Sequence, residues 1–327
     1  MKVWYDACTG KHVRYGVAVA KRLRSRGHSV LLTTRQHPDT LPMIKFLNEK
    51  FTVVGKYDPE TLLTRLKEGT RRQLAFCRLF EKSRPDLAVS HGSIDLCRVA
   101  FGLAVPAITT VDTPYAEAVH KLTLPLSKYI VASRAIPEEN LKPYVAEGKI
   151  QTFEGVDEVA WIKNFKPPIT YDFGRPLIVV RQLEEKAAYS TGRVDMLALA
   201  KKLTRLGKVV FLARYSRDSV EGLITPKFVD SASLVAQADL FVGVGGTITR
   251  EAALQGTPSI VVNLFQGQFV NDFLVEKGFP IFKTEPSKVA ELAKKVLAQK
   301  CDVKDKLEAL EDPVDLISAI AEKTRGH

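Results

Sequence analysis

The chain of 327 residues lacks several features that would place it in a special class. No apolar run approaches the roughly 20 residues that a membrane-spanning helix needs. The first residues, MKVWYDACTGK, contain no hydrophobic signal-peptide core. The four cysteines show no CxxC spacing of the kind that binds zinc or forms a redox disulfide: Cys8, Cys77, Cys97 and Cys301. We therefore expect a reduced, cytoplasmic protein without a structural metal ion.

Signals for nucleic-acid binding and for repeat architectures are also missing. The sequence has no aromatic-rich basic strand, zinc finger or helix-turn-helix pattern, and no repeat at solenoid spacing, so we do not expect a nucleic-acid partner. It does carry a net charge of +11. Part of this charge lies in a first basic cluster (Lys21, Arg22, Arg24 and Arg26) and a second basic cluster (Arg65, Lys67, Arg71 and Arg72). Solvated helix faces explain most such clusters, and an anionic substrate or anionic membrane surface is the alternative.

Short apolar runs alternate with amphipathic segments along the chain, which predicts an α/β protein with parallel sheets. A segment rich in proline, 164–176, interrupts the alternation as a linker would. We therefore predict two doubly wound domains, at 1–165 and 166–327, with the helical tail in the second. Strands are expected at 2–5, 29–34, 51–54, 86–89, 107–109, 129–131, 177–180, 209–213, 227–229, 240–244 and 259–262. A long helix within 59–83 is expected to bury Leu62, Leu63, Leu66, Leu74, Phe76, Leu79 and Phe80.

A glycine pair in the second half predicts an anion-binding site. Gly245 and Gly246 follow a buried strand and precede a helix that Thr247 or Thr249 could cap. Glycine lets the backbone come close to a ligand, and the free N–H groups and dipole of the helix attract negative charge. Glu251, assigned to the first turn of this helix, could accept hydrogen bonds from ribose hydroxyls. The alternative is an ordinary strand–helix turn with a dipole-favoured glutamate.

The first strand is followed by a polar turn. Thr9 and Gly10 are predicted to open a helix and to contact an acceptor substrate, and His12 lies in its first turn. A neutral imidazole there could act as a base or donate a hydrogen bond to phosphate. A capping or surface histidine is the alternative.

Two further loops follow predicted strands of the first half. His91 could contact a sugar or phosphate or merely hold its loop, and the nearby Ser93 is assigned to the acceptor. Asp112 is a candidate general base, although Asp before Thr-Pro is also a common turn former. In the second half, Arg181 ends a strand, where it could neutralise phosphate or pair with Glu184 or Glu185.

The segments TGKH, GVAVAKRLRSRGHSVLLTT and GGTITREAALQGTPSIV resemble the GT-B glycosyltransferases. The resemblance implies a nucleotide-sugar donor, UDP-linked as a first expectation, that is bound in the second domain. It assigns the diphosphate to Gly245, Gly246 and Thr247, and the ribose to Glu251. No DxD triplet is present, so we expect no obligatory divalent metal.

PDLAVSHGSIDLCRVAFGLAVPAITTVDTP is similar to a segment of the UDP-N-acetylglucosamine 2-epimerases. Asp112 falls at a catalytic glutamate of that family. Ser93 replaces an acidic residue, however, and Val180 and Arg181 stand where the epimerases have a histidine. Over its whole length the chain is identified as a member of an uncharacterised prokaryotic family, domain of unknown function 354, through SHGSIDLCRVAFGLAVP, DTPYAEAVHKLTLPLSKYIVAS, FEGVDEVAWI and VVRQLEEKAAY.

These observations favour a glycosyltransferase that moves a sugar from a UDP-linked donor to an acceptor hydroxyl. His12, Asp112 and His91 are the catalytic candidates. A sugar-nucleotide epimerase or hydrolase and a non-catalytic sugar-nucleotide-binding protein are the alternatives. The acceptor is open, and an anionic or lipid-linked acceptor with peripheral membrane contact is one expectation.

Overall fold

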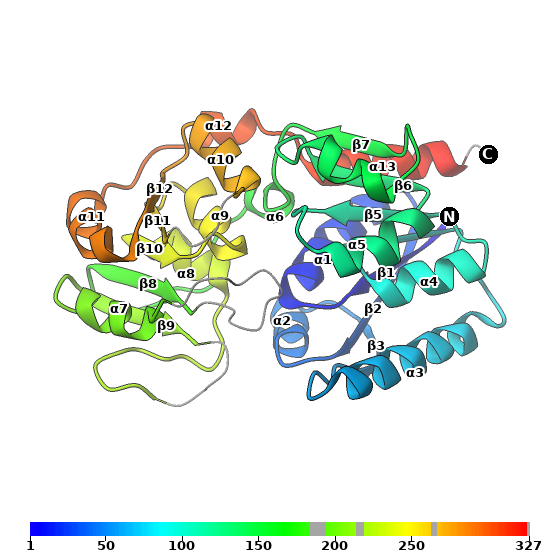
Figure 1. Ribbon diagram of the computed structural model, residues 1–327, viewed down its shortest axis with the longest axis horizontal. Helices are drawn as coiled ribbons and strands as arrows, with labels where there is room; N and C mark the ends of the chain where they lie inside the picture. The colour runs from blue at the N-terminus through cyan, green and yellow to red at the C-terminus, as the bar shows by residue number, and fades with distance from the viewer. Residues whose placement is uncertain (183–193, 214–218, 263–266, 326–327) are drawn as a thin grey trace. The chain divides into compact units, whose positions relative to one another are not determined.

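The computed structural model describes residues 1–182, 194–213, 219–262 and 267–325. The chain divides into two compact units (Figure 1). The first contains Met1–Trp161 together with Glu311–His327, and the second contains Ile162–Leu310.

The first unit is built on a seven-stranded, all-parallel sheet with the order β3-β2-β1-β4-β5-β6-β7. Chain order runs outward in both directions from β1, as in a doubly wound fold. The strands are β1 (Lys2–Ala7), β2 (Ser29–Gln36), β3 (Thr52–Lys56), β4 (Leu87–Ser90), β5 (Ala107–Val111), β6 (Tyr129–Ser133) and β7 (Ile150–Phe153).

Helices cover both faces of this sheet because alternate residues of a strand point to opposite sides. Val3 and Tyr5 of β1 pack in the cluster under α1 (Gly10–Ser25), α2 (Thr40–Leu47) and α13 (Pro313–Arg325). Trp4 points the other way, toward α3 (Leu62–Phe80) and α4 (Ile94–Gly102). Its ring makes edge contacts with Phe76 and Phe80 at 4.7 Å between centroids. The shorter helices of this unit are α5 (Glu117–Thr123) and α6 (Val159–Ile162), which ends at the unit boundary.

The last helix belongs to the first unit, which corrects the expectation that the helical tail completes the second. Val314, Ile317, Ile320 and Ala321 form the apolar face of α13 and are buried in the cluster under α1. Apolar burial therefore holds the C-terminal segment on the first sheet.

The second unit has a five-stranded parallel sheet with the order β12-β11-β10-β8-β9. Its strands are β8 (Leu177–Arg181), β9 (Lys208–Leu212), β10 (Leu240–Gly243), β11 (Ser259–Val262) and β12 (Ile281–Thr284). One face packs on α7 (Met196–Leu203) and α11 (Val289–Val296), and the other packs on α8 (Ser231–Gln237) and α9 (Thr247–Leu254). The remaining helices are α10 (Phe269–Glu276) and α12 (Lys304–Glu308).

Most expected elements are confirmed, with three differences. β7 and β12 were not anticipated, and no strand forms at 227–229. The long helix is present as α3 and buries Phe76 and Phe80, but its leucines are exposed: Leu62, Leu63, Leu66, Leu74 and Leu79. The prediction that these leucines belong to the core is wrong.

Candidate functional site

Each unit has one topological switch point, the place where neighbouring strands lead to helices on opposite faces of the sheet. In the first unit it lies between β1 and β4, and in the second between β8 and β10. Loops at the carboxyl ends of such strands diverge and leave a crevice, which is where doubly wound sheets bind ligands. The residues singled out in the sequence lie in or beside these loops.

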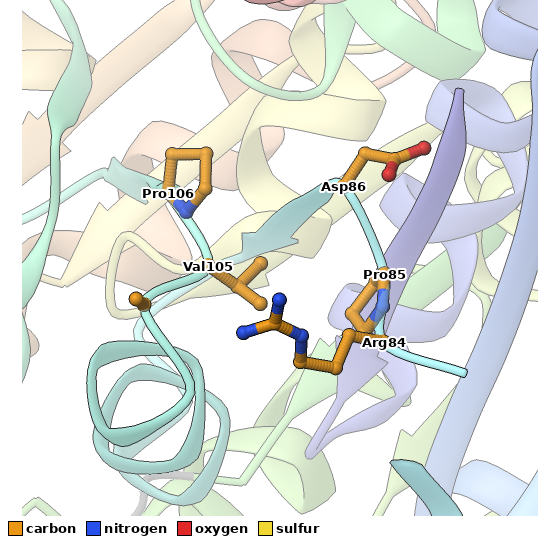
Figure 2. Close-up of a pocket in the computed structure, with 6 residues that line it drawn as sticks. Arg84, Pro85, Asp86, Val105 and Pro106 are labelled. Carbon is orange, nitrogen blue, oxygen red and sulfur yellow. The ribbon is translucent and has the colours of Figure 1, made fainter. Parts of the chain in front are cut away.

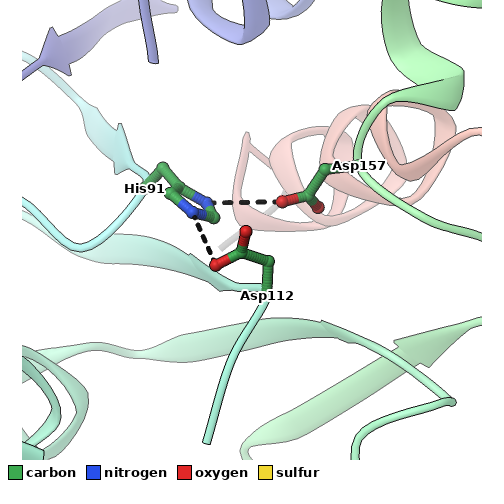
Figure 3. Close-up of side chains that lie close together, drawn as sticks. All are labelled: His91, Asp112 and Asp157. Atoms are coloured by element: carbon green, nitrogen blue, oxygen red, sulfur yellow. Dashed lines mark hydrogen bonds and ion pairs between the residues drawn. The ribbon is translucent and has the colours of Figure 1, made fainter. Parts of the chain in front are cut away.

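At the first switch point, an ammonium group joins two carboxylates (Figure 3 shows the residues around it). Lys11, in the first turn of α1, places Nζ 2.5 Å from Oδ2 of Asp112 and 2.8 Å from Oδ2 of Asp157. Glu158 Oε1 lies 3.9 Å from the same nitrogen. We call Lys11, His91, Asp112 and Asp157 the Lys11 cluster. It combines one permanent cation with several carboxylates, so its local charge is negative.

His91 is held through both ring nitrogens. Nε2 lies 3.2 Å from Asp112 Oδ1, and Nδ1 lies 2.6 Å from the hydroxyl of Thr110 and 3.6 Å from Asp157 Oδ2. The side chain is almost fully buried. Nε2 can donate to Asp112, and Nδ1 can exchange a hydrogen bond with the hydroxyl of Thr110. Both ring nitrogens of His91 are therefore engaged by neighbouring side chains.

His12 stands beside this cluster with its ring 4.8 Å from that of His91, edge to face. It is partly exposed. Its Nδ1 accepts a long hydrogen bond of 3.4 Å from the backbone N–H of Cys8. Desolvation, and then the neighbouring His91 and Lys11, lower the pKa of His12 well below its usual value. The imidazole is therefore neutral at physiological pH, as a proton acceptor must be.

The turn before His12 forms as expected. Thr9 is the N-cap of α1 and its hydroxyl accepts from the N–H of His12, while Gly10 is the first helical residue. A side chain at Gly10 would press on the backbone of Asp39, since an added Cβ would lie 3.3 Å from its carbonyl oxygen. Both residues have a structural reason for their identity, and their contact with an acceptor stays a prediction.

Ser93 belongs to a second, deeper network. Its hydroxyl donates to Asp6 at 2.5 Å and caps α4 by accepting from the N–H of Leu96. The side chain is 1% exposed. Asp6 also forms a two-pronged ion pair with the buried guanidinium of Arg72, at 2.5 and 3.0 Å. This geometry gives Ser93 a structural task and does not favour the predicted acceptor contact.

At the second switch point, the glycine corner has one covered side and one open side. Gly245 has a φ of +99°, a conformation that favours glycine, and an added Cβ there would collide with Gln268 and Asn271. Gly246 is the N-cap of α9 and has no heavy atom of the described residues within 4 Å of an added Cβ. Within the described residues, the first N–H groups of α9 therefore begin beside open space. Arg250 brings positive charge close, with Nη1 3.4 Å from the carbonyl oxygen of Gly245.

Two expectations for α9 need correction. No side chain caps this helix, because Thr247 is already its first residue and the hydroxyl of Thr249 is buried. Glu251 is the fifth helical residue and is only 1% exposed. Its Oε2 accepts from the hydroxyl of Ser231 at 2.7 Å. A ribose would have to displace this internal bond, so the geometry does not favour the ribose role predicted for Glu251.

Arg181 ends β8, next to the second switch point, as the sequence suggested. Its Nη1 lies 3.4 Å from the carbonyl oxygen of Leu212 on β9. The alternative partners Glu184 and Glu185 lie outside the described residues. Phosphate contact by Arg181 stays a prediction.

One group of side chains in the described residues could hold a divalent metal ion. His91, Asp112 and Asp157 place one ligand atom each within 4.8 Å of one another. The ammonium of Lys11 contacts both carboxylates of this group. An internal cation thus competes directly with any metal for these ligands.

Sequence reasoning missed several residues of these sites. Asp157 follows β7, a strand that was itself not anticipated, and Lys11 was not among the predicted site residues. Asn271 donates to the carbonyl oxygen of Gly245 at 3.0 Å and to Gln268 Oε1 at 2.8 Å. Within the described residues, Asn271 Oδ1 and Gln268 Nε2 are buried without a hydrogen-bond partner. In the segment GQFVND, Gln268 just before α10 and Asn271 inside it were the sequence signal that could have located this part of the site.

A hollow elsewhere on the first unit is not part of this site (Figure 2). It is lined by residues that precede β4 and β5: Arg84, Pro85, Asp86, Ala104, Val105 and Pro106. It therefore lies at the amino ends of the strands, the edge opposite the switch-point loops.

The family model for a protein of unknown function, DUF354, matches residues 1–324. The chain belongs to this family. An uncharacterised relative, MJ0665 of Methanocaldococcus jannaschii, is 29% identical over 338 residues, covering 97% of this chain and 96% of the relative.

Solved structures identify the fold. The UDP-GlcNAc 2-epimerase of Methanocaldococcus jannaschii is similar with a TM-score of 0.70 at 13% identity, covering 99% of this chain and 100% of that one. The Neisseria meningitidis UDP-GlcNAc 2-epimerase, solved with UDP-GlcNAc, gives 0.66 at 17% identity, with 99% of both chains covered. A kitacinnamycin glycosyltransferase gives 0.65 at 14% identity, covering 99% and 98%. The chain therefore has the two-domain α/β architecture of GT-B proteins, as the sequence predicted.

None of the helices that the structure describes is both long and apolar enough to cross a membrane.

Proposed function

We propose that the protein binds a sugar nucleotide, UDP-linked as the first expectation, in its second unit and transfers the sugar to an acceptor hydroxyl bound in its first unit. The observation that carries this proposal is the division of chemistry between the two switch points. The first offers a neutral imidazole beside carboxylates, and the second offers helix N–H groups, a guanidinium and two amide side chains.

This division matches the two halves of a transfer reaction. Carboxylates repel phosphate and accept hydrogen bonds from hydroxyls, so the Lys11 cluster suits a hydroxyl-bearing acceptor. Bare amides at a helix N-terminus suit the diphosphate of a donor and the charge that grows on it as the glycosidic bond breaks. Gln268 and Asn271 would orient the donor through their unpaired atoms.

His12 is the group best suited to take the proton from the acceptor hydroxyl. Asp112 is ion-paired with Lys11 and contacts His91, whereas within the described residues the one hydrogen bond of the His12 ring is the long bond from Cys8. While Nδ1 accepts this bond, the proton of the neutral ring is on Nε2. Because a donor–acceptor distance of 3.4 Å makes a weak hydrogen bond, losing it costs little. The ring proton can then move to Nδ1, which leaves Nε2 free to accept the proton of the acceptor hydroxyl. His91 and Asp112 then position the site rather than react.

Isomerisation of a sugar nucleotide is the second candidate. It is supported by the close grouping of His91, Asp112 and Asp157, which could exchange protons with a bound sugar, and by the fold shared with two UDP-GlcNAc 2-epimerases. Incubation with a panel of UDP- and dTDP-sugars separates the candidates. A sugar changed without acceptor indicates isomerisation, and nucleoside diphosphate released only with acceptor indicates transfer.

The donor site has a test that leaves the fold intact. Gly246 has a φ of −86° and no described heavy atom near its Cβ position, so Gly246→Ala should fold, with a melting temperature lowered by a few degrees at most because Ala is a poorer N-cap than Gly. The added methyl group would stand where the diphosphate approaches, and we expect UDP affinity in calorimetry to fall about tenfold or more. His12→Gln is the matched variant, expected to keep UDP affinity and lose turnover. No binding of any nucleoside diphosphate, or equal affinity in Gly246→Ala, would contradict the assignment.

A further inference from the structure

Helix α3 of the first unit exposes an unusual amount of apolar side chain. Leu63, Leu66 and Leu74 are 58%, 67% and 53% exposed, and Leu62, at the start of the helix, is 81% exposed. Single exposed leucines are ordinary, but several in one row mark an interaction surface. Leu63, Leu66, Thr70, Leu74 and Cys77 follow one another at spacings of three and four residues, so they form one row along the helix. We call this row the outer face of α3.

The outer face points away from the protein. The opposite side of the helix carries Glu68, Arg72, Phe76 and Phe80, which are buried against the sheet and α4. α3 has 19 residues, which corresponds to a rod of roughly 28 Å. Its start is fixed by a capping box between Thr61 and Thr64. The outer face is therefore a long, regular apolar strip with nothing of the first unit over it in the described residues.

Positive charge lines one side of this strip. Lys67, Arg71 and Arg78 are exposed and lie in one row beside the outer face, at spacings of four and seven residues. The sole acid of the helix, Glu68, is nearly buried and pairs with Arg71 at 2.5 Å. Among residues whose placement is described, no carboxylate forms an ion pair with Lys67 or Arg78. We call Lys67, Arg71 and Arg78 the basic row.

The first basic cluster differs from the basic row because no large apolar side chain of α1 is exposed beside it, and the fold also neutralises part of it. Arg22 pairs with Asp312 and Asp315, and Nη1 of Arg24 donates to both carboxylate oxygens of Glu49, at 3.0 Å each. Of the two clusters seen in the sequence, only the one on α3 therefore combines available positive charge with exposed apolar surface. The adjacent α4 adds Arg98 and Phe101, both exposed, one helical turn apart.

We infer that the outer face and basic row of α3 dock on an anionic lipid surface, with the helix lying in the plane of the interface. An apolar face flanked by lysine and arginine is the pattern by which interfacial helices combine apolar insertion with attraction to anionic headgroups. Self-association through the same strip is disfavoured, because a two-fold interface would bring two basic rows together. The inference concerns α3 alone and is independent of the proposed reaction.

Co-sedimentation with vesicles tests it. At low salt the full chain should bind phosphatidylcholine vesicles that contain phosphatidylglycerol and should bind pure phosphatidylcholine much more weakly. Leu66→Gln/Leu74→Gln should lower binding about tenfold or more by removing the inserted groups. Lys67→Gln/Arg78→Gln should lower it roughly 25-fold on anionic vesicles, at about fivefold for each charge, and should remove most of its salt dependence.

Matched controls come from the second unit. Val275→Gln removes an exposed apolar residue of α10, and Lys294→Gln/Lys295→Gln removes two exposed charges of α11. We expect both to bind vesicles like the wild type, and all variants to melt at the wild-type temperature. Absence of binding to anionic vesicles, or binding that the α3 variants do not change, would overturn the inference. A wild-type dimer that becomes a monomer in Leu66→Gln/Leu74→Gln would also overturn it, because the strip would then be an interface between copies.

Discussion

The two switch points of this protein differ in how their polar side chains are partnered. At the first, the charged groups are paired within the chain: Lys11 with Asp112 and Asp157, and Arg72 with Asp6. At the second, polar atoms beside the glycine corner lack partners in the described residues, including Gln268 Nε2 and Asn271 Oδ1. A buried polar group without a partner is costly, so it tends to persist where a ligand completes it. The buried hydroxyls of Tyr5 and Tyr15, near Asp157, also lack partners in the described residues, so the contrast lies between paired charges at the first switch point and unpaired amide groups at the second.

The largest effect should come from breaking the deepest pair of the first unit. Asp6→Ala leaves the guanidinium of Arg72, which is 1% exposed, without its main counter-charge. We expect a loss of about 3–5 kcal/mol of unfolding free energy, measured by urea denaturation. Arg71→Ala is the control, since its exposed pair with Glu68 should be worth less than about 1 kcal/mol. Equal losses of unfolding free energy in the two variants would show that the buried pair of Asp6 and Arg72 stabilises the first unit no more than an exposed pair does.

Removing the internal cation should have the next largest effect. Lys11→Ala leaves Asp112 and Asp157 facing each other near Glu158, and we expect a loss of about 2–3 kcal/mol at neutral pH, because the pair is partly exposed. Zn²⁺ should raise the melting temperature of Lys11→Ala and not that of Lys21→Ala, an exposed control on the same helix. A Zn²⁺ response in both variants would refute a site specific to His91, Asp112 and Asp157.

The sequence predicted the architecture well because parallel strands and glycine turns carry local signals. The apolar run at Leu240–Gly243 and the turn at Gly245 could be located from the residues alone. The partners of Lys11 could not be located in this way. Lys11 and Asp157 are 146 positions apart and meet only when the sheet forms. Ser93 illustrates the same limit: its position after a strand suggested a ligand contact, whereas a distant aspartate engages it.

The leucines of α3 show a different limit. Helical periodicity revealed that they share rows, but it could not tell which row faces the sheet. The buried row instead contains Glu68 and Arg72 beside Phe76. Arg72 can be buried because Asp6, Asp95 and the carbonyl oxygen of Val54 receive its N–H groups. A charged residue thus occupies a core position that hydrophobicity alone would assign to leucine.

Glu251 offers a medium-sized test of the second switch point. If its carboxylate serves Ser231, Glu251→Ala should cost about 1–3 kcal/mol of stability and leave UDP affinity within a few-fold of the wild type. Urea denaturation and calorimetry on the same samples measure both quantities. Glu276→Ala, an exposed change in α10, is the control for stability. Full stability with a large loss of UDP affinity would restore the ribose contact that the sequence suggested.

The smallest effect concerns protonation of His12 at the first switch point. Its pKa is lowered in the folded state, chiefly by desolvation, so below about pH 6.5 the unfolded chain takes up a proton that the folded chain resists. Stability should therefore fall as the pH drops from about 6.5 toward the folded-state pKa, by at most about 1.4 kcal/mol per pH unit. His12→Gln should remove this contribution. If His12 is the base, activity should begin to fall on the acidic side only below pH 6.5, because the lowered pKa keeps the imidazole neutral down to that pH. A fall that begins at or above pH 6.5 would mean that another group takes the proton, and that the first switch point positions the acceptor without reacting with it.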